Sequence, residues 1–265
     1  MAALFVVTPQ AQTPLLPLDQ VRPGMIGVGR TVFAGTRLED FKVEVIGVLR
    51  NVLAPKRDLI LARLEGGPLA KTGVIAGMSG SPVYVDGKLM GAVSYSLGQF
   101  STEPIAGITP IAEMVDATAA PAAARASRPV SIPLPASPRE LMEIWSRDLG
   151  RAQSFVTDSA QALVLSGVSS DVARLSAMLR PIATPLVASG FDASVIDPLS
   201  PAFAAAGFVP MSSAQAQGAK APAARGFQPG DAIGVGLMTG DLELGATGTV
   251  THVDGDRVYA FGHPM

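Results

Sequence analysis

The chain has 265 residues, of which 48% are hydrophobic, and this is enough apolar material for one large domain or two smaller ones. Its net charge of −2, with no basic run, argues against nucleic acid as a partner. The absence of cysteine excludes disulfides and thiolate metal sites, and the presence of only two histidines, His252 and His263, argues against a histidine-rich metal site.

Residues 1–19 leave two interpretations open. The apolar run at 2–7, followed by small and polar residues at 8–12, is typical of the end of a signal peptide and its cleavage region, but no basic segment precedes it. Either the natural start lies upstream and the protein is secreted or periplasmic, which we expect, or these residues are a flexible N-terminus. No apolar run reaches the about eighteen residues that a transmembrane helix needs, so no transmembrane segment is predicted.

A series of short strands is predicted between residues 20 and 116. The segments 21–33, 41–49 and 58–65 alternate apolar with small or polar residues, as half-buried strands do. An Asp86-Gly87 turn then joins two further strands into a hairpin. Short strands separated by Gly and Pro turns predict a mainly β fold, with an antiparallel β-barrel over residues 20–116.

The hydrophobic period changes after this barrel. Residues 117–136 are rich in Ala and Pro and predict a linker. Residues 137–210 are predicted to form a small insertion that contains helices as well as strands. Residues 211–229 predict a flexible linker, because Ala, Gln and Ser dominate them. Strand character returns at 230–265, which we interpret as the start of a β segment that bears His263.

Two helices are predicted within the insertion. The first begins at Ser137-Pro138-Arg139-Glu140, which combines a capping box with proline at the first helical position. The second is capped by Ser170 and ends at Pro181. Helical spacing predicts that the buried faces consist of Leu141, Ile144, Trp145 and Leu149 in the first helix and of Val172, Leu175 and Leu179 in the second.

The loop Gly77-Met78-Ser79-Gly80-Ser81-Pro82 is the strongest candidate for a reactive site. It is not the nucleophile elbow of α/β-hydrolases, since Ser81 stands where a glycine is needed and a strand rather than a helix follows. It has no Gly-Lys-Ser/Thr ending, so it is not a phosphate loop. An ordinary turn remains open, because Gly, Ser and Pro are common in turns. The loop resembles the Gly-Asp-Ser-Gly-Gly-Pro loop of chymotrypsin-like serine peptidases, and that resemblance makes Ser79 the nucleophile.

A wider resemblance extends over roughly residues 20–116 and 230–265. The loop with its hairpin, the strand at 104–111, and the segment from Gly248 to Pro264 are similar to the SpoIVB (S55) peptidase family, whose serine motif the loop repeats letter for letter. The resemblance implies a chymotrypsin-like β-barrel, an incomplete second barrel, and a secreted bacterial serine peptidase that cleaves a protein partner. The chain departs from the family pattern in two ways: the serine precedes the histidine, and the PDZ domain is lacking. Together these departures suggest a permuted and truncated chain.

The resemblance also implies roles for individual residues. A serine hydroxyl needs a base within hydrogen-bond reach, and His263, which follows a glycine, matches the family's catalytic histidine. The matching acid is Glu65, which could equally be a solvated charge at a strand end. The backbone N–H groups of Gly77 and Ser79 would form the oxyanion hole. His252 is interpreted as structural, and no metal or organic cofactor is implied.

A second class of function remains open. The chain could be a catalytically incomplete module of the same type that acts as a protein-binding or structural β domain of the cell envelope. A fluorophosphonate probe distinguishes the two hypotheses, because it labels only an activated serine.

Overall fold

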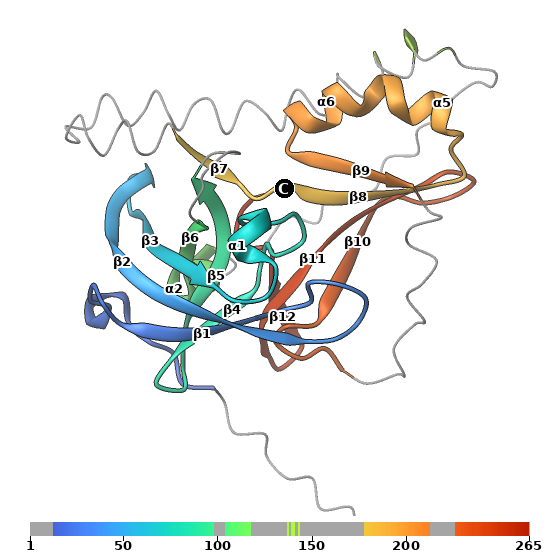
Figure 1. Cartoon of the computed structure of the whole chain (residues 1–265). Helices are drawn as coiled ribbons and strands as arrows, with labels where there is room; N and C mark the ends of the chain where they lie inside the picture. The colour runs from blue at the N-terminus through green and yellow to red at the C-terminus, as the bar shows by residue number, and fades with distance from the viewer. Residues whose placement is uncertain are drawn as a thin grey trace, which may run out of the picture.

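In the computed structural model, two β-structures lie side by side, a closed barrel and an open sheet (Figure 1). The structure describes residues 13–97, 104–117, 137, 139, 140, 143, 178–212 and 226–264. Strands predominate and the helices are short, so the predicted mainly β fold is confirmed.

Six antiparallel strands form the barrel. Their order around it is β4-β1-β2-β3-β6-β5, and pairing of β4 with β5 closes the ring. The predicted antiparallel barrel is therefore confirmed. The strands are β1 (Ile26–Thr31), β2 (Glu39–Ala54), β3 (Arg57–Glu65), β4 (Pro82–Val85), β5 (Lys88–Leu97) and β6 (Ile105–Pro110).

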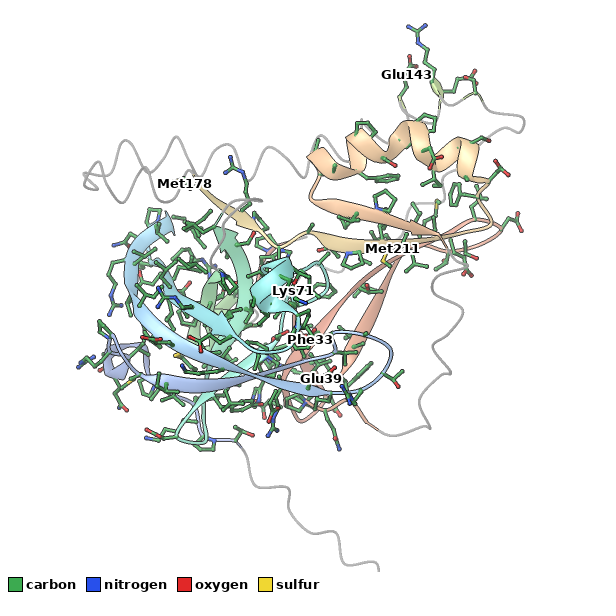
Figure 2. All side chains as sticks on the ribbon, in the orientation of Figure 1. Phe33, Glu39, Lys71, Glu143, Met178 and Met211 are labelled. Atoms are coloured by element: carbon green, nitrogen blue, oxygen red, sulfur yellow. The ribbon has the colours of Figure 1, made fainter. Side chains whose placement is uncertain are left out.

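The period-two sequence pattern accounts for the barrel. In β1 exposed and buried residues alternate strictly, and β3 likewise buries Ile60, Ala62 and Leu64 on one face. Ile60, Ala62 and Leu64 belong to one apolar core, and Figure 2 shows side chains filling the ring of strands. The β4–β5 hairpin turns at Asp86 and Gly87, which both have positive φ, as the type I′ turn of a two-residue hairpin requires.

Three short helices accompany the barrel. A 3-10 helix η1 (Leu18–Gln20) precedes β1, and α1 (Leu69–Thr72) lies between β3 and the serine loop. The helix α2 (Ile111–Ala117) follows β6 and buries Ile111 and Met114 against Leu89 and Ala92 of β5.

The second structure is an open five-stranded sheet. Its order is β10-β11-β8-β9, with β12 paired to β11, and its one parallel pair is β8–β9. Three short helical segments connect β8 to β9 and cover one face of the sheet with an apolar cluster (Figure 1). The elements are β8 (Thr184–Ser189), α5 (Ala193–Ile196), η2 (Asp197–Leu199), α6 (Ser200–Ala205), β9 (Phe208–Ser212), β10 (Ala232–Met238), β11 (Glu243–Asp254) and β12 (Arg257–Ala260).

One sequence-based prediction is wrong in this region. Leu179 does not lie on the second predicted helix, because its last described helical residue is Met178 and Leu179 begins a strand, β7 (Leu179–Pro181), which pairs with β5. Extension of the barrel sheet overrides the helical spacing here, because β5 offers unpaired backbone groups at its end. The remainder of this helix, from Ser170 through Val172 and Leu175, lies outside the described residues.

The start of the first predicted helix is partly described. Glu140 Oε2 accepts hydrogen bonds from the Ser137 N–H and hydroxyl, both at 2.8 Å, and the Glu140 N–H donates to Ser137 Oγ at 3.3 Å. This is the reciprocal contact of a capping box. The buried face predicted for this helix, Leu141, Ile144, Trp145 and Leu149, lies outside the described residues, as do the central parts of both predicted linkers, 118–136 and 213–225. Within the described part of the chain, none of the helices is long and apolar enough to cross a membrane.

Candidate active site

The serine loop lies between α1 and β4 and is fixed by backbone hydrogen bonds. The Gly80 N–H donates to Val93 O at 2.8 Å and the Ser81 N–H donates to Met78 O at 2.9 Å. Gly77 and Gly80 have φ values of +91° and +94°, which residues with a Cβ rarely adopt. The glycines on either side of Ser79 therefore permit the loop's shape.

Strand β11 lies directly against this loop. A Cβ added to Gly80 would be 2.0 Å from Thr249 O and 2.5 Å from Phe261 N, so only glycine fits between them. The Thr249 N–H donates to Ser79 O, and the hydroxyls of Thr249 and Thr251 donate to Gly77 O and Gly80 O, at 2.7 to 2.9 Å. The open sheet is thus docked on the barrel at the loop itself.

The Ser79 side chain is completely buried at this contact. Its hydroxyl donates to Phe261 O at 2.6 Å, across 182 positions of sequence. Phe261 and Gly262 have φ values of +65° and +74°, so the chain turns sharply after β12. His263 is the next residue, and the turn that carries it is in direct contact with Ser79.

The ring of His263 is held in one tautomer. Nδ1 lies 2.8 Å from Pro264 O, and because a carbonyl can only accept, Nδ1 carries the proton. Nε2 is then an acceptor, and it is buried without a partner among the described residues. Burial lowers the pKa of His263, while the nearby backbones of Pro264 and Ile182 oppose this change. The imidazole is therefore neutral at pH 7, which is the form that a general base requires.

Two N–H groups of the loop have no acceptor in the described part of the chain, and these belong to Gly77 and Ser79. Those of Met78, Gly80 and Ser81 all donate to backbone carbonyls. Free N–H groups on either side of a serine can stabilise the oxyanion of a tetrahedral intermediate. The loop thus leaves unbonded the two donors that its sequence predicts for this task.

Comparison with protein families identifies the part of the chain that carries this loop. The model of the SpoIVB peptidase S55 family matches residues 8–113. Residues 8–113 are therefore similar to the SpoIVB peptidase S55 family. The match covers the barrel with Ser79 and indicates a serine peptidase, while β8–β12 and His263 lie outside it. Comparison with curated proteins and with solved structures gave no match.

The structure does not bring Glu65 of the S55 domain to the histidine. Its carboxylate lies 3.0 Å from Lys42 Nζ at the end of β3, and both side chains are about half exposed. No carboxylate contributes to the pKa shift of His263. Among the described residues, the Ser79 hydroxyl bonds to Phe261 O and not to His263 Nε2, so the structure brings the histidine's turn to the serine without a hydrogen bond between the two side chains.

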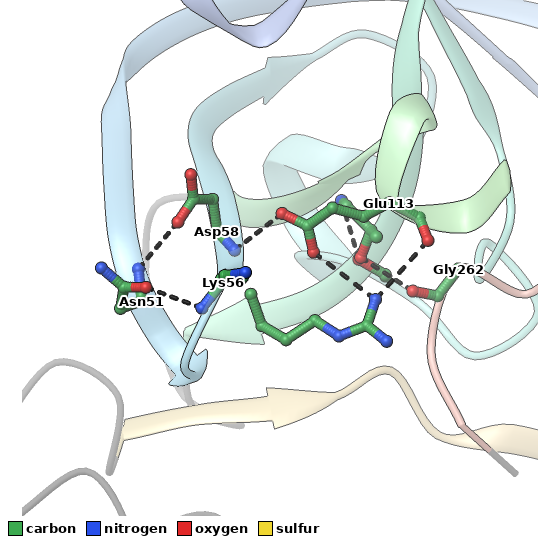
Figure 3. Close-up of polar contacts among 8 residues, drawn as sticks. Asn51, Lys56, Asp58, Glu113 and Gly262 are labelled. Carbon is green, nitrogen blue, oxygen red and sulfur yellow. Dashed lines mark hydrogen bonds and ion pairs between the residues drawn. The ribbon is translucent and has the colours of Figure 1, made fainter. Parts of the chain in front are cut away.

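A different acid acts on the tyrosine that contacts the histidine, and sequence analysis missed it. Glu113 of α2 accepts a hydrogen bond from the Asp58 N–H at 2.7 Å and lies 3.9 Å from Arg57 (Figure 3). Burial raises its pKa. Burial raises the pKa of Tyr95 to about 12, and the charge of Glu113 adds to this rise. The Tyr95 ring meets the His263 ring edge-on, with centroids 6.3 Å apart. Glu113 is thus separated from the imidazole by a tyrosine.

The other histidine has a structural environment, as the sequence suggests. His252 of β11 stacks on Tyr259 of β12, with ring centroids 5.8 Å apart and planes 27° apart. Burial lowers its pKa and the charge of Asp254 opposes this. Its place in the β11–β12 hairpin is that of a packing residue.

The threonines that dock β11 were also missed by sequence analysis. Thr249 and Thr251 are two residues apart, so in a strand both hydroxyls point to the same face. This face meets the serine loop. The alternation Gly-Thr-Val-Thr was the available signal, but it identifies a polar face without naming its partner.

Proposed function

We propose that the chain is a serine endopeptidase that cleaves a protein partner outside the cytoplasm, with Ser79 as nucleophile and His263 as general base. The main support is the 2.6 Å hydrogen bond from Ser79 Oγ to Phe261 O, since it joins the serine to the turn that carries the histidine. The S55 match and the unbonded N–H groups of Gly77 and Ser79 support the same reaction class.

The chemistry follows from these groups. The Ser79 hydroxyl leaves Phe261 O, and its proton passes to His263 Nε2 while Oγ bonds to the substrate's carbonyl carbon. The N–H groups of Gly77 and Ser79 hold the resulting oxyanion, and Pro264 O keeps the imidazolium in place through Nδ1. The C–N bond then breaks as Nε2 returns the proton to the leaving amine, and a water molecule activated by Nε2 hydrolyses the acyl-enzyme.

The structure is a closed form of this site. Ser79 has no exposed surface, because Thr249, Phe261 and the region around Pro185 cover the loop. A substrate carbonyl can reach Ser79 only when the Phe261 carbonyl moves off the serine hydroxyl. Opening must break the Ser79–Phe261 hydrogen bond. The same movement therefore frees the Ser79 hydroxyl and lets the substrate reach it.

Labelling with a fluorophosphonate probe tests the proposal. We expect wild-type protein to be labelled, and Ser79→Ala to lose labelling, with peptide turnover reduced on the order of 10⁶-fold. Ser81→Ala is the matched control in the same loop and should keep most activity. Turnover that survives Ser79→Ala but not Ser81→Ala would reassign the nucleophile.

The proposed location has a separate test. The composition of residues 2–12 supports export, because it matches the end of a signal peptide. With its natural start, the protein should accumulate in the periplasm or medium. Recovery only from the cytoplasm would reject this part of the proposal.

A second candidate function is a protein-binding or structural module of the cell envelope. Two observations favour it: Ser79 is completely buried with its hydroxyl engaged, and Glu65 pairs with Lys42 rather than with an imidazole. In that case no serine of the folded wild-type protein reacts with the probe at any pH.

A further inference from the structure

The turn that carries His263 receives two side-chain hydrogen bonds from the barrel. Ser79 Oγ donates to Phe261 O at 2.6 Å, and Thr109 Oγ1 of β6 donates to Gly262 O at 2.7 Å. Figure 3 shows the bond to Gly262. These carbonyls are consecutive, and no other barrel side chain in the described part of the chain bonds to residues 261–263.

The direction of the second contact can be deduced from donor and acceptor counting. Gly262 O can only accept, so the single hydroxyl proton of Thr109 is used there. Ser94 Oγ has two acceptors within reach of its single proton, Thr109 Oγ1 at 2.7 Å and Gly107 O at 3.2 Å, and the contact with Thr109 is the shorter one. Ser94 Oγ in turn accepts from the Thr109 N–H at 3.1 Å. The Ser94–Thr109 pair is thus a hydrogen-bonded unit from which the Thr109 hydroxyl donates to the residue before His263.

This contact lies where the two β-structures touch. A Cβ added to Gly262 would be 3.0 Å from the Cβ atoms of both Ala92 and Ser94, so the turn lies on the outer face of β5. Both hydroxyls are buried, and a buried hydroxyl that loses its partner is costly. The Ser94–Thr109 pair therefore fixes the height of the turn above the barrel.

We propose that Thr109, oriented by Ser94, is a positioning residue that holds His263 at the serine loop while Ser79 reacts. The inference rests on the proposed function, in which the Ser79 hydroxyl must leave Phe261 O. From that moment Thr109 supplies the remaining barrel side-chain bond to the turn. Thr109 touches neither the substrate nor the reacting atoms, and it acts through the backbone of Gly262.

The protonation of His263 provides a readout that does not depend on activity. The groups around its ring are Tyr95 of β5 and the backbones of Ile182 and Pro264, and the nearest charges, Arg57 and Glu113, act on Tyr95 rather than on His263. Burial is the main cause of its lowered pKa. A turn that leaves the barrel exposes the ring to water, so the pKa of His263 should rise toward its ordinary value.

The test compares Thr109→Val, which is similar in shape but lacks the hydroxyl, with Thr109→Ser, which keeps it. We expect Thr109→Val to slow fluorophosphonate labelling at least about tenfold and to raise the His263 pKa measured by NMR, and Thr109→Ser to restore both. Thr72→Val, at an exposed threonine of α1, is the matched control and should change neither value. Ser94→Ala should act in the same direction as Thr109→Val, and it serves as the second variant if Thr109→Val does not fold.

The NMR measurement separates this inference from the proposed function. In Ser79→Ala the only barrel side-chain bond to the turn among the described residues is that from Thr109, so Ser79→Ala/Thr109→Val should show the largest rise in the His263 pKa. If the wild type is not labelled but the pKa series holds, the peptidase proposal fails and the positioning contact stands. An unchanged His263 pKa in folded Thr109→Val and in the double variant overturns the positioning role.

Discussion

The barrel and the open sheet hold their functional residues in different ways. The barrel has a continuous core and its ring has no free edge, so the Ser79 loop starts from a closed frame. In the open sheet no residue of β10 is buried, and Leu237 is 49% exposed. His263 follows the β11–β12 hairpin of this sheet, in which Val250, Thr251 and Tyr259 are buried. The Ser79 loop thus starts from a closed ring and His263 lies beyond the last strand of an open sheet, so in the proposed function we expect the histidine to be the more movable partner.

The contact between the barrel and the open sheet has a polar part and an apolar part. At the serine loop it consists of hydroxyl and backbone hydrogen bonds from Thr249, Thr251 and Thr109. Farther along β12, Tyr259 packs into an apolar cluster with Leu89 and Met114. Hydrogen bonds can be exchanged for water or substrate at lower cost than apolar burial. We infer that opening breaks the Ser79–Phe261 bond at the polar end and leaves the Thr109–Gly262 bond and Tyr259 in place.

The largest expected effect is on turnover, and it should separate His263 from His252. His263→Ala should reduce turnover on the order of 10⁶-fold, because the serine loses its base. His252→Ala removes a ring of the same type that stacks on Tyr259, and it should cost stability without a comparable loss of rate. Steady-state peptide cleavage by the two variants measures the difference. Equal losses would mean that the open sheet supplies no base.

Gly80→Ala should break the docking of the sheet. The new Cβ would meet Thr249 O at 2.0 Å and would sit at a φ of +94°, so we expect a loss of about 3 kcal/mol or more in unfolding free energy. Gly87→Ala, at a φ of +74° with no atom within 4 Å, isolates the backbone strain and should cost about 1 kcal/mol. Urea unfolding gives both values. Similar costs for the two variants would contradict the close approach of β11.

The pH dependence should reflect the neutral state of His263. Labelling should rise with pH through its folded-state pKa, which burial places below the ordinary value of about 6.5, and should be level above that. Stability has the same sign: the unfolded state binds the proton more readily, so unfolding free energy falls as pH drops from about 6.5 through the folded pKa. His252 shifts in the same direction, so His263→Ala should remove only part of this dependence. A labelling midpoint above 6.5 would contradict the buried base.

Glu65→Gln should have the smallest effect. The half-exposed ion pair with Lys42 contributes at most about 1 kcal/mol, and we expect turnover to stay within about twofold of wild type. Lys42→Met should give a similarly small change. Removal of a triad acid costs about 10⁴-fold in rate, so a loss of that size would restore Glu65 to the catalytic group.

Local patterns in the sequence predict the barrel well. The period-two strands, the Asp86-Gly87 turn and the glycines around Ser79 are all local, and the structure realises each of them. Long-range contacts were not readable in the same way. Leu179 becomes a strand residue because β5 pairs with it, and the approach of Phe261 to Ser79 depends on how β11 docks. The partner of Glu65 also became apparent only from the register of β2 and β3, which places it opposite Lys42.

The hydrogen bond between Ser79 and Phe261 O sets a kinetic limit on any reagent that attacks the serine. A buried hydroxyl bonded to a carbonyl of its own chain reacts only in the fraction of molecules in which that carbonyl has moved away. The observed rate of modification should therefore become independent of reagent concentration and level off at the rate at which the turn opens. A segment of substrate that displaces Phe261 would raise this plateau, so the chain's own carbonyl acts as a competitor that sets when the serine is available.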